Sequence, residues 1–279
     1  MSNTKTRPST ANRYEDRVVA LVDILGWRGL LCQDHERPPE VACRAIDRLQ
    51  LEISSQAAAE QSGHRPPGAD FTVFQLNLKD QYTDYGISSD SPNEGNFQLN
   101  QFSDHLLLSC RTEGITPRIM IERMSNLLWT MLASGLFLRG AVVVGKLVHS
   151  STTALGPALI RAHFLESRVA IYPRVIVDDA LEDVINHSAP TGVRLDRLMG
   201  QPLCRDPDGL LFIDFIRSRF LRARVVDGME TWRSIHDSLL ERRRQHAEKP
   251  DVLAKDNWMI AYFNDVVRQA PELASLEIK

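Results

Sequence analysis

Two apolar segments each carry a single acidic residue, and this feature constrains the fold more than any other. The first segment, Val18 to Gly26, is apolar throughout except for Asp23, and the second, Gln101 to Leu108, contains Asp104. Burying a charge on a strand is costly unless a partner neutralises it. Two carboxylates repel one another, whereas a divalent cation held between them would satisfy both. The pattern therefore predicts a paired-carboxylate cation site.

A competing interpretation is that each Asp is satisfied separately, by backbone groups or by an arginine. Strand alternation places Phe102 and Leu106 on the same face as Asp104. His105 is then expected to point the other way, which argues against a joint Asp–His site.

Composition limits the remaining classes. The 279 residues are 43% hydrophobic and 25% charged, which is typical of one large globular domain or a domain with an appendage. The formal net charge of -3 gives no reason to expect a nucleic acid partner. The longest apolar stretch, Leu127 to Leu138, is shorter than the roughly 20 residues that span a bilayer, so no membrane partner is expected.

Cysteine usage and the first residues indicate a cytoplasmic protein. The four cysteines lie far apart without a CxxC pair and are expected to be reduced thiols. Residues 1–13 are polar and have no apolar core of a signal peptide, so a flexible tail is predicted there.

Hydrophobic periodicity predicts alternating strands and helices. Strands are expected at residues 17–25, 70–78, 97–110 (a strand pair or one long strand carrying Asp104), 136–148, 172–177 and 210–215. Helices are expected at residues 42–53, 117–134, 155–169, 228–246 and 251–269, with an exposed loop at 79–95. This order predicts an α+β fold with a ferredoxin-like βαββαβ core, whose helices cover one face of a mainly antiparallel sheet. Residues 14–185 would form the main domain, and residues 186–279 a mainly helical C-terminal extension packed on it.

Other familiar site patterns are missing from the sequence. No HExxH or HxH arrangement supports a zinc site, and no GxSxG motif marks a nucleophilic serine. The spacing of Gly135, Gly140 and Gly145 matches neither a Walker A loop nor a dinucleotide-binding fingerprint.

Four short motifs follow one another within about residues 17–180. They are Asp23-Ile24-x-Gly26-Trp27, Phe102-Ser103-Asp104, Arg139-Gly140-Ala141-x-x-x-Gly145 and Gly156-Pro157-Ala158-x-x-x-Ala162. In this order and spacing they resemble the class III nucleotide cyclase homology domain. Each motif is weak alone, but four in sequence are fairly specific.

The resemblance implies roles for the residues of the first two motifs. Asp23 and Asp104 would bind two Mg²⁺ or Mn²⁺ ions, with the Ile24 carbonyl as a further ligand. Backbone amides after Gly26, through Trp27 and Arg28, would hold the triphosphate.

The fourth motif departs from the family pattern. Purine cyclases have an asparagine where Ile160 stands and an arginine where Phe164 stands, and both contact the transition state. Arg161 is one residue away and is a candidate replacement, although a surface position is an equal alternative.

The base-reading positions also depart from the purine cyclases. By counting from the motifs, these positions are Asn100 and Thr153, which match neither the adenine-reading nor the guanine-reading pair. With the Tyr172-Pro173-Arg174 segment, this makes the chain similar to the bacterial pyrimidine cyclases of Pycsar anti-phage defence. For Tyr172 and Arg174 we favour the start of the next strand over base contact.

The resemblance implies a homodimer with interfacial active sites that converts UTP or CTP to cyclic UMP or CMP and pyrophosphate. The product would act on a separate effector protein. Two alternatives stay open, a catalytically silent cyclase-homology module that binds nucleotide or a partner, and a purine cyclase with an unusual pocket.

Overall fold

A computed structural model describes residues 13–27, 40, 47, 97–114, 116–187, 203–218 and 228–279 of the chain. Several predicted features fall on other residues. The strand at 70–78 and the loop at 79–95 lie outside the described residues, and so does all of the helix at 42–53 except Asp47, which is helical.

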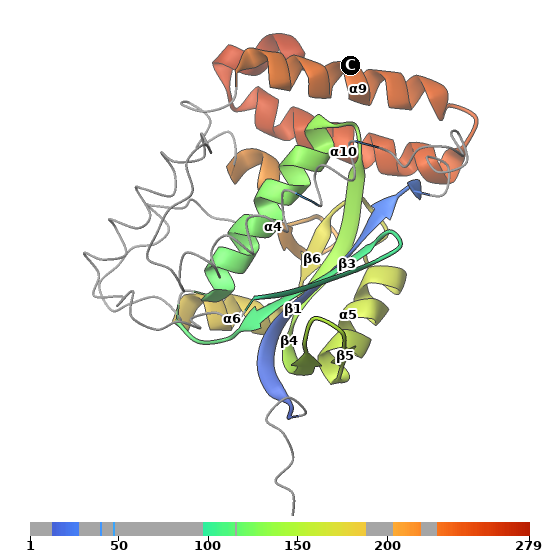
Figure 1. The fold of residues 1–279 in the computed structure, drawn as a ribbon. Coiled ribbons are helices and arrows are strands. Elements are labelled where there is room, and N and C mark those ends of the chain that lie inside the picture. Colours follow the sequence, from blue (N-terminus) through green and yellow to red (C-terminus); the bar gives the residue numbers. More distant parts are fainter. Residues whose placement is uncertain are drawn as a thin grey trace, which may run out of the picture.

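The core is a mixed eight-stranded sheet in the order β2-β3-β1-β4-β6-β8-β7, with β5 paired to β4 at the side (Figure 1). Its strands are β1 (Glu15–Leu25), β2 (Gln98–Phe102), β3 (His105–Arg111), β4 (Phe137–His149), β5 (Ala154–Leu155), β6 (Val175–Val177), β7 (Leu203–Arg205) and β8 (Leu211–Ile213). The first four strands pair antiparallel, in the order of a ferredoxin-like core. Only β4 and β6 pair in parallel among the described strands. The predicted α+β class is confirmed.

The central strand β1 is hydrophobic because it is covered on both faces. All residues from Val18 to Val22 are buried, so alternation between polar and apolar residues is lost. Gly140 on β4 permits close approach to β1, since a Cβ atom built there would lie 2.3 Å from the Leu21 carbonyl oxygen. These contacts fix the position of Asp23 at the end of β1.

Helices cover both faces of the sheet. The helices are α4 (Thr116–Ala133), α5 (Pro157–Arg168), α6 (Asp179–His187), α9 (Met229–Gln245), α10 (Pro250–Arg268) and the short 3₁₀ helix η2 (Pro271–Leu276). One hydrophobic cluster joins α4, α6, α9 and α10 to one face, and a second joins α5 to the other (Figure 1). The expectation of helices on one face was therefore wrong. The second face is closed because Ala158 and Ala162 are small enough for α5 to pack closely on Val19 and Leu21.

The C-terminal part is more closely joined to the core than a helical extension would be. Strands β7 and β8 continue the main sheet, although only β8 was predicted from the sequence. The two predicted C-terminal helices are confirmed as α9 and α10. None of the described helices is long and apolar enough to cross a membrane.

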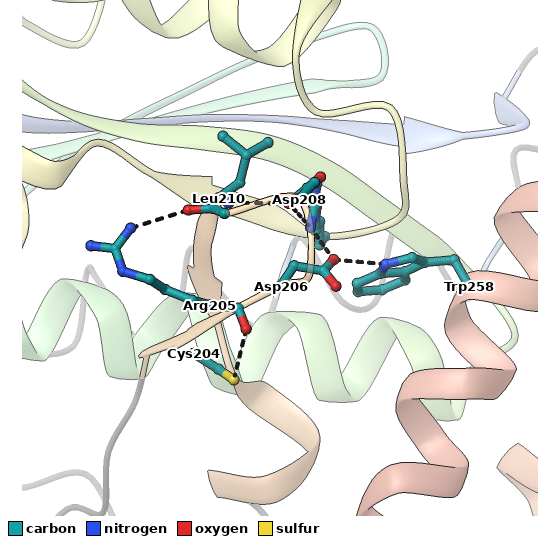
Figure 2. Close-up of polar contacts among 8 residues, drawn as sticks. Cys204, Arg205, Asp206, Asp208, Leu210 and Trp258 are labelled. Atoms are coloured by element: carbon teal, nitrogen blue, oxygen red, sulfur yellow. Dashed lines mark hydrogen bonds and ion pairs between the residues drawn. The ribbon is translucent and has the colours of Figure 1, made fainter.

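A buried arginine ties these strands to α10. Arg174, immediately before β6, is 1% exposed and forms ion pairs with Asp206 and Asp208 in the β7–β8 turn. The Trp258 indole of α10 donates a hydrogen bond to Asp206 at 2.8 Å (Figure 2). The Arg174 guanidinium also lies 5.6 Å from the centroid of the Trp258 ring. This cluster neutralises Arg174, which agrees with a role at the start of β6.

Candidate functional site

Asp23 lies where β1 meets two neighbouring strands. It faces His105 of β3 and Arg139 of β4 in the strand register, so all three side chains project from the same face of the sheet. The Asp23 side chain is only 11% exposed. The sequence prediction of a nearly buried carboxylate on an apolar strand is confirmed for this residue.

Asp104 lies in a turn rather than within a strand. Ser103 and Asp104 connect β2 to β3, and Ser103 has a φ of 57°, in the left-handed region that tight turns use. The Asp104 side chain is 30% exposed, so the expectation of a strand carboxylate was wrong here. The turn is held against β1, because the Ile24 amide donates a hydrogen bond to the Asp104 carbonyl oxygen at 3.1 Å.

The turn brings Asp104 beside Asp23. One carboxylate oxygen from each and a ring nitrogen of His105 all lie within 4.8 Å of one another. The expectation that His105 points away was wrong. It assumed uninterrupted strand alternation from Phe102 to Leu106, but the turn breaks that alternation. His105 Nδ1 lies 3.2 Å from Asp104 Oδ1, and its ring stacks on Phe102 with centroids 5.6 Å apart.

Arg139 supplies a positive charge to this cluster. Its Nε atom lies 3.2 Å from Asp23 Oδ2. Its Nη2 atom lies 2.9 Å from Glu166 Oε1 on α5, an ion pair that is not aligned as a hydrogen bond. The competing interpretation is thus correct in part, since Asp23 has an arginine partner. In the described part of the chain, the ion-pair partner of Asp104 is His105 and no arginine pairs with it.

The pKa values of the two carboxyl groups are shifted in opposite directions. Burial raises the pKa of Asp23 above its ordinary value, and the negative charge of Asp104 also raises it. The positive charges of Arg139 and His105 lower the Asp23 pKa, but they do not cancel the effect of burial. Burial also pushes the pKa of Asp104 upward. Hydrogen bonds from its own backbone and from Ser103 outweigh that effect, and the Asp104 pKa is lowered overall. Such divergence is typical of neighbouring carboxyl groups.

The donor set fits a divalent cation. Two carboxylates in close proximity are the ligands that Mg²⁺ and Mn²⁺ prefer, and an imidazole nitrogen is also available. The cation would remove the repulsion between Asp23 and Asp104, of which Arg139 relieves only part. The Ile24 carbonyl stays a predicted ligand.

The predicted phosphate-binding segment begins directly after β1. Gly26 has a φ of +82° and turns the chain out of the strand, and Trp27 adopts a helical conformation. Positive φ values favour glycine, which explains Gly26 at this point. Arg28 lies outside the described residues.

Of the two predicted base-reading residues, Asn100 contacts His149 and Thr153 lies near it in the chain fold. Asn100 Oδ1 of β2 lies within hydrogen-bond distance of His149 Nε2, at 3.0 Å. His149 is the register partner of Ala154, and Thr153 precedes Ala154 in an exposed turn. The sequence prediction missed His149, whose position near the end of β4 gives no indication of this contact.

Helix α5 presents apolar groups where the cyclase pattern has polar ones. Ile160 is 74% exposed and Phe164 is 51% exposed. Together with Tyr14 and Leu155 they line a shallow hollow. Arg161 borders the same hollow and forms an ion pair with Asp178 at 3.3 Å, so its predicted substrate contact stays a prediction.

Comparisons with known proteins give limited information. No family model matches the chain, and no curated protein matches it. Among solved structures it is similar to a bacterial light-regulated adenylyl cyclase, with 14% sequence identity and a TM-score of 0.35. The similarity covers 62% of this chain and 45% of that one, so the chain spans less than half the length of that structure. The functional interpretation must therefore come from the residues of the site.

Proposed function

We propose that this chain is a nucleotide cyclase that converts UTP or CTP to a 3′,5′-cyclic nucleotide and pyrophosphate. The observation that supports it best is the meeting of Asp23 and Asp104 within one cluster, although the two residues are far apart in the sequence. In the reaction, the ribose 3′-hydroxyl gives up its proton to solvent, and its oxygen forms a bond to the α-phosphorus as the bond to pyrophosphate breaks. Two Mg²⁺ or Mn²⁺ ions would lower the pKa of the 3′-hydroxyl and neutralise charge on the pyrophosphate.

The residues of the chain have separable tasks in this proposal. Asp23 and Asp104 would hold the cations, and Arg139 holds the Asp23 carboxylate in place through their 3.2 Å contact. The turn at Gly26 directs the backbone amide of Trp27 towards the triphosphate, because amides after a left-handed residue form anion-binding concavities.

The base specificity is proposed from the neutral side chains at the base-reading positions. Asn100 and Thr153 offer short hydrogen-bonding groups and no charge. Such groups suit the smaller pyrimidine ring, whose edge carries one donor and acceptors in uracil. The cyclic UMP or CMP formed would act as a second messenger for a separate effector, as in anti-phage defence.

A second copy of the chain is the proposed occupant of the hollow on α5. Ile160, Phe164, Leu155 and Tyr14 are each about half exposed or more, although they are large and apolar. Contiguous apolar groups of this kind mark interaction surfaces. The hollow lies on the helix that packs over the Asp23 face of the sheet, so a partner bound there would reach the face that carries the cation site.

A catalytically silent nucleotide-binding module is the second candidate. The exposed Ile160 and Phe164 favour it, because the polar groups that purine cyclases use are missing from α5. The clustering of Asp23 and Asp104 opposes it, because a module without turnover has no need for two neighbouring negative charges.

Incubation with each of UTP, CTP, ATP and GTP in the presence of Mn²⁺, followed by mass spectrometry, tests the proposal. We expect cyclic UMP or cyclic CMP from the unaltered protein and no product from Asp23→Ala. A purine product would reassign the substrate. Calorimetry with a non-hydrolysable UTP analogue identifies the silent module. Tight binding of the analogue, together with no cyclic product from any of the four triphosphates, would favour that alternative.

A further inference from the structure

A row of hydrogen bonds crosses the face of the sheet and ends at Asn100. Arg17 Nε donates to Ser109 Oγ at 2.8 Å, and Ser109 Oγ lies 2.7 Å from His149 Nδ1. His149 Nε2 lies 3.0 Å from Asn100 Oδ1. Arg17 and Ser109 are fully buried, so the first half of the row is shielded from water.

One arrangement of protons gives every contact in this row a donor and an acceptor. An arginine side chain can only donate, so Ser109 Oγ accepts from Arg17 and has one proton of its own to give. We assign that proton to the 2.7 Å contact with His149 Nδ1, which is then the acceptor nitrogen of the ring. The ring proton of His149 is then on Nε2 and is donated to Asn100 Oδ1.

His149 is held in this neutral form. Burial lowers its pKa to about 4, and the nearby Arg17 charge acts in the same direction. A neutral imidazole has one donor nitrogen and one acceptor nitrogen, as the row requires.

Asn100 consequently keeps one orientation. Its oxygen is occupied by His149, and the amide nitrogen faces away from the row with its two N–H donors. Asn100 is half-buried, and within the described part of the chain its amide nitrogen makes no hydrogen bond. A partner approaching this side chain meets a donor.

We infer that His149, held by Ser109 and Arg17, is a positioning residue that fixes Asn100 as a hydrogen-bond donor and so selects uracil over cytosine. The two bases share an acceptor at position 2 and differ at position 4, where uracil has a carbonyl oxygen and cytosine an amino group. A fixed donor attracts the carbonyl and repels the amino group. This inference rests on the proposed cyclase function and deepens it.

The preference for UTP over CTP is expected to be large. A site with a fixed polar group discriminates strongly, because the wrong base leaves two donors facing each other without a partner. We expect kcat/KM for UTP to exceed that for CTP by at least about tenfold.

Two substitutions at position 149 test the positioning role. His149→Leu removes the bond to Asn100 and lets its amide rotate, so the UTP/CTP ratio is expected to fall to within about threefold of unity. His149→Gln keeps an N–H donor for Asn100 and is expected to retain most of the preference. A ratio that is the same in the unaltered protein and both variants would overturn the inference.

Substitution of Asn100 itself gives an independent readout. Asn100→Asp replaces the donors with acceptors, and we expect the preference to reverse in favour of CTP. Gln101→Asp adds the same charge one residue along β2, on the opposite face, and is expected to leave the ratio unchanged. An unchanged ratio in Asn100→Asp, with a normal melting temperature, would contradict the assignment.

The proton arrangement can be measured without any turnover. The ¹⁵N chemical shifts of His149 at neutral pH are expected to show the Nε2–H tautomer, and a protonated Nδ1 would overturn the inference. If no triphosphate is cyclised, the proposed function fails. The inference is then judged by calorimetry with UTP and CTP analogues, where equal affinity or no binding rejects it.

Discussion

Arg139 and Asp23 are direct register partners on adjacent strands, with Nε of the arginine 3.2 Å from the carboxylate. The guanidinium also reaches Glu166 of α5, which is 2% exposed. One side chain therefore neutralises part of the charge at the candidate cation site and anchors a helix on the same face. The contacts of Arg139 make its effects on stability and on cation binding separable by substitution.

Replacing Asp23 should abolish cyclisation and leave the fold intact. Asp23→Asn keeps the shape of a nearly buried side chain but removes the charge that holds a cation. We expect cyclic product to fall by at least about 10³-fold, a loss typical of a metal ligand. Circular dichroism is expected to be unchanged, and the melting temperature should stay within a few degrees. Substantial residual product would exclude Asp23 as a cation ligand.

Removing Arg139 should destabilise the protein through Glu166. Arg139→Gln leaves the buried Glu166 carboxylate without its cation, which we expect to cost about 2 kcal/mol of unfolding free energy. The double variant Arg139→Gln/Glu166→Gln should recover most of that loss, because the unpaired charge is then absent. Urea unfolding of both variants and of Glu166→Gln alone completes the cycle. Additive effects would show that the two side chains are not coupled.

The sequence predicted the strand that carries Asp23 because a continuous apolar run is typical of a central strand. Of the two alternatives for residues 97–110, the strand pair is confirmed and the single long strand is wrong. Ser103 adopts a left-handed backbone conformation, but the sequence there contains no turn signal such as Asn-Gly. One long strand therefore remained possible. The misplacement of His105 followed from that alternative.

Other parts of the site depend on tertiary contacts alone. Arg139 was visible as a charge within a predicted strand, but its partner Glu166 lies on α5, and the sequence does not show that this helix packs on the same face of the sheet. Strand β7 has only three residues, too few for a period of two to be recognised. His149 could have been found only by knowing the register that brings β4 near Asn100.

Stability should fall as the pH drops from about 6.5 towards 4, and His149 is one cause. The unfolded chain takes up a proton on this residue near pH 6.5, whereas burial lowers the folded pKa to about 4. Between these values the unfolded state binds more protons, so acid favours unfolding. After allowance for partial exposure, the loss at pH 5 is about 1 kcal/mol.

Thermal unfolding at pH 7, 6 and 5 measures this contribution. His149→Gln has no titrating group at this position, so its stability should decline less steeply with acid than that of the unaltered protein. Parallel curves for the two proteins would remove His149 as a source of the pH dependence.

Mn²⁺ should raise the melting temperature through the Asp23–Asp104 pair. A cation that binds only the folded state at 100 times its dissociation constant stabilises it by about 2.7 kcal/mol. That gain corresponds to a rise of several degrees for a chain of this size. Differential scanning fluorimetry over a range of Mn²⁺ concentrations is the measurement. Asp104→Asn should lose most of the rise, and an identical rise in this variant would place the binding elsewhere.

A charge in the hollow on α5 should separate the proposed dimer. Ile160→Asp places a carboxylate at a position that is 74% exposed, so the folded monomer tolerates it, whereas burial in an interface does not. We expect sedimentation velocity to show a monomer, and cyclic product to fall in parallel because the sites need both copies. Ile171→Asp is the matched control, since Ile171 is 59% exposed and does not line the hollow. Dissociation by both substitutions, or by neither, would rule out this surface as the dimer contact.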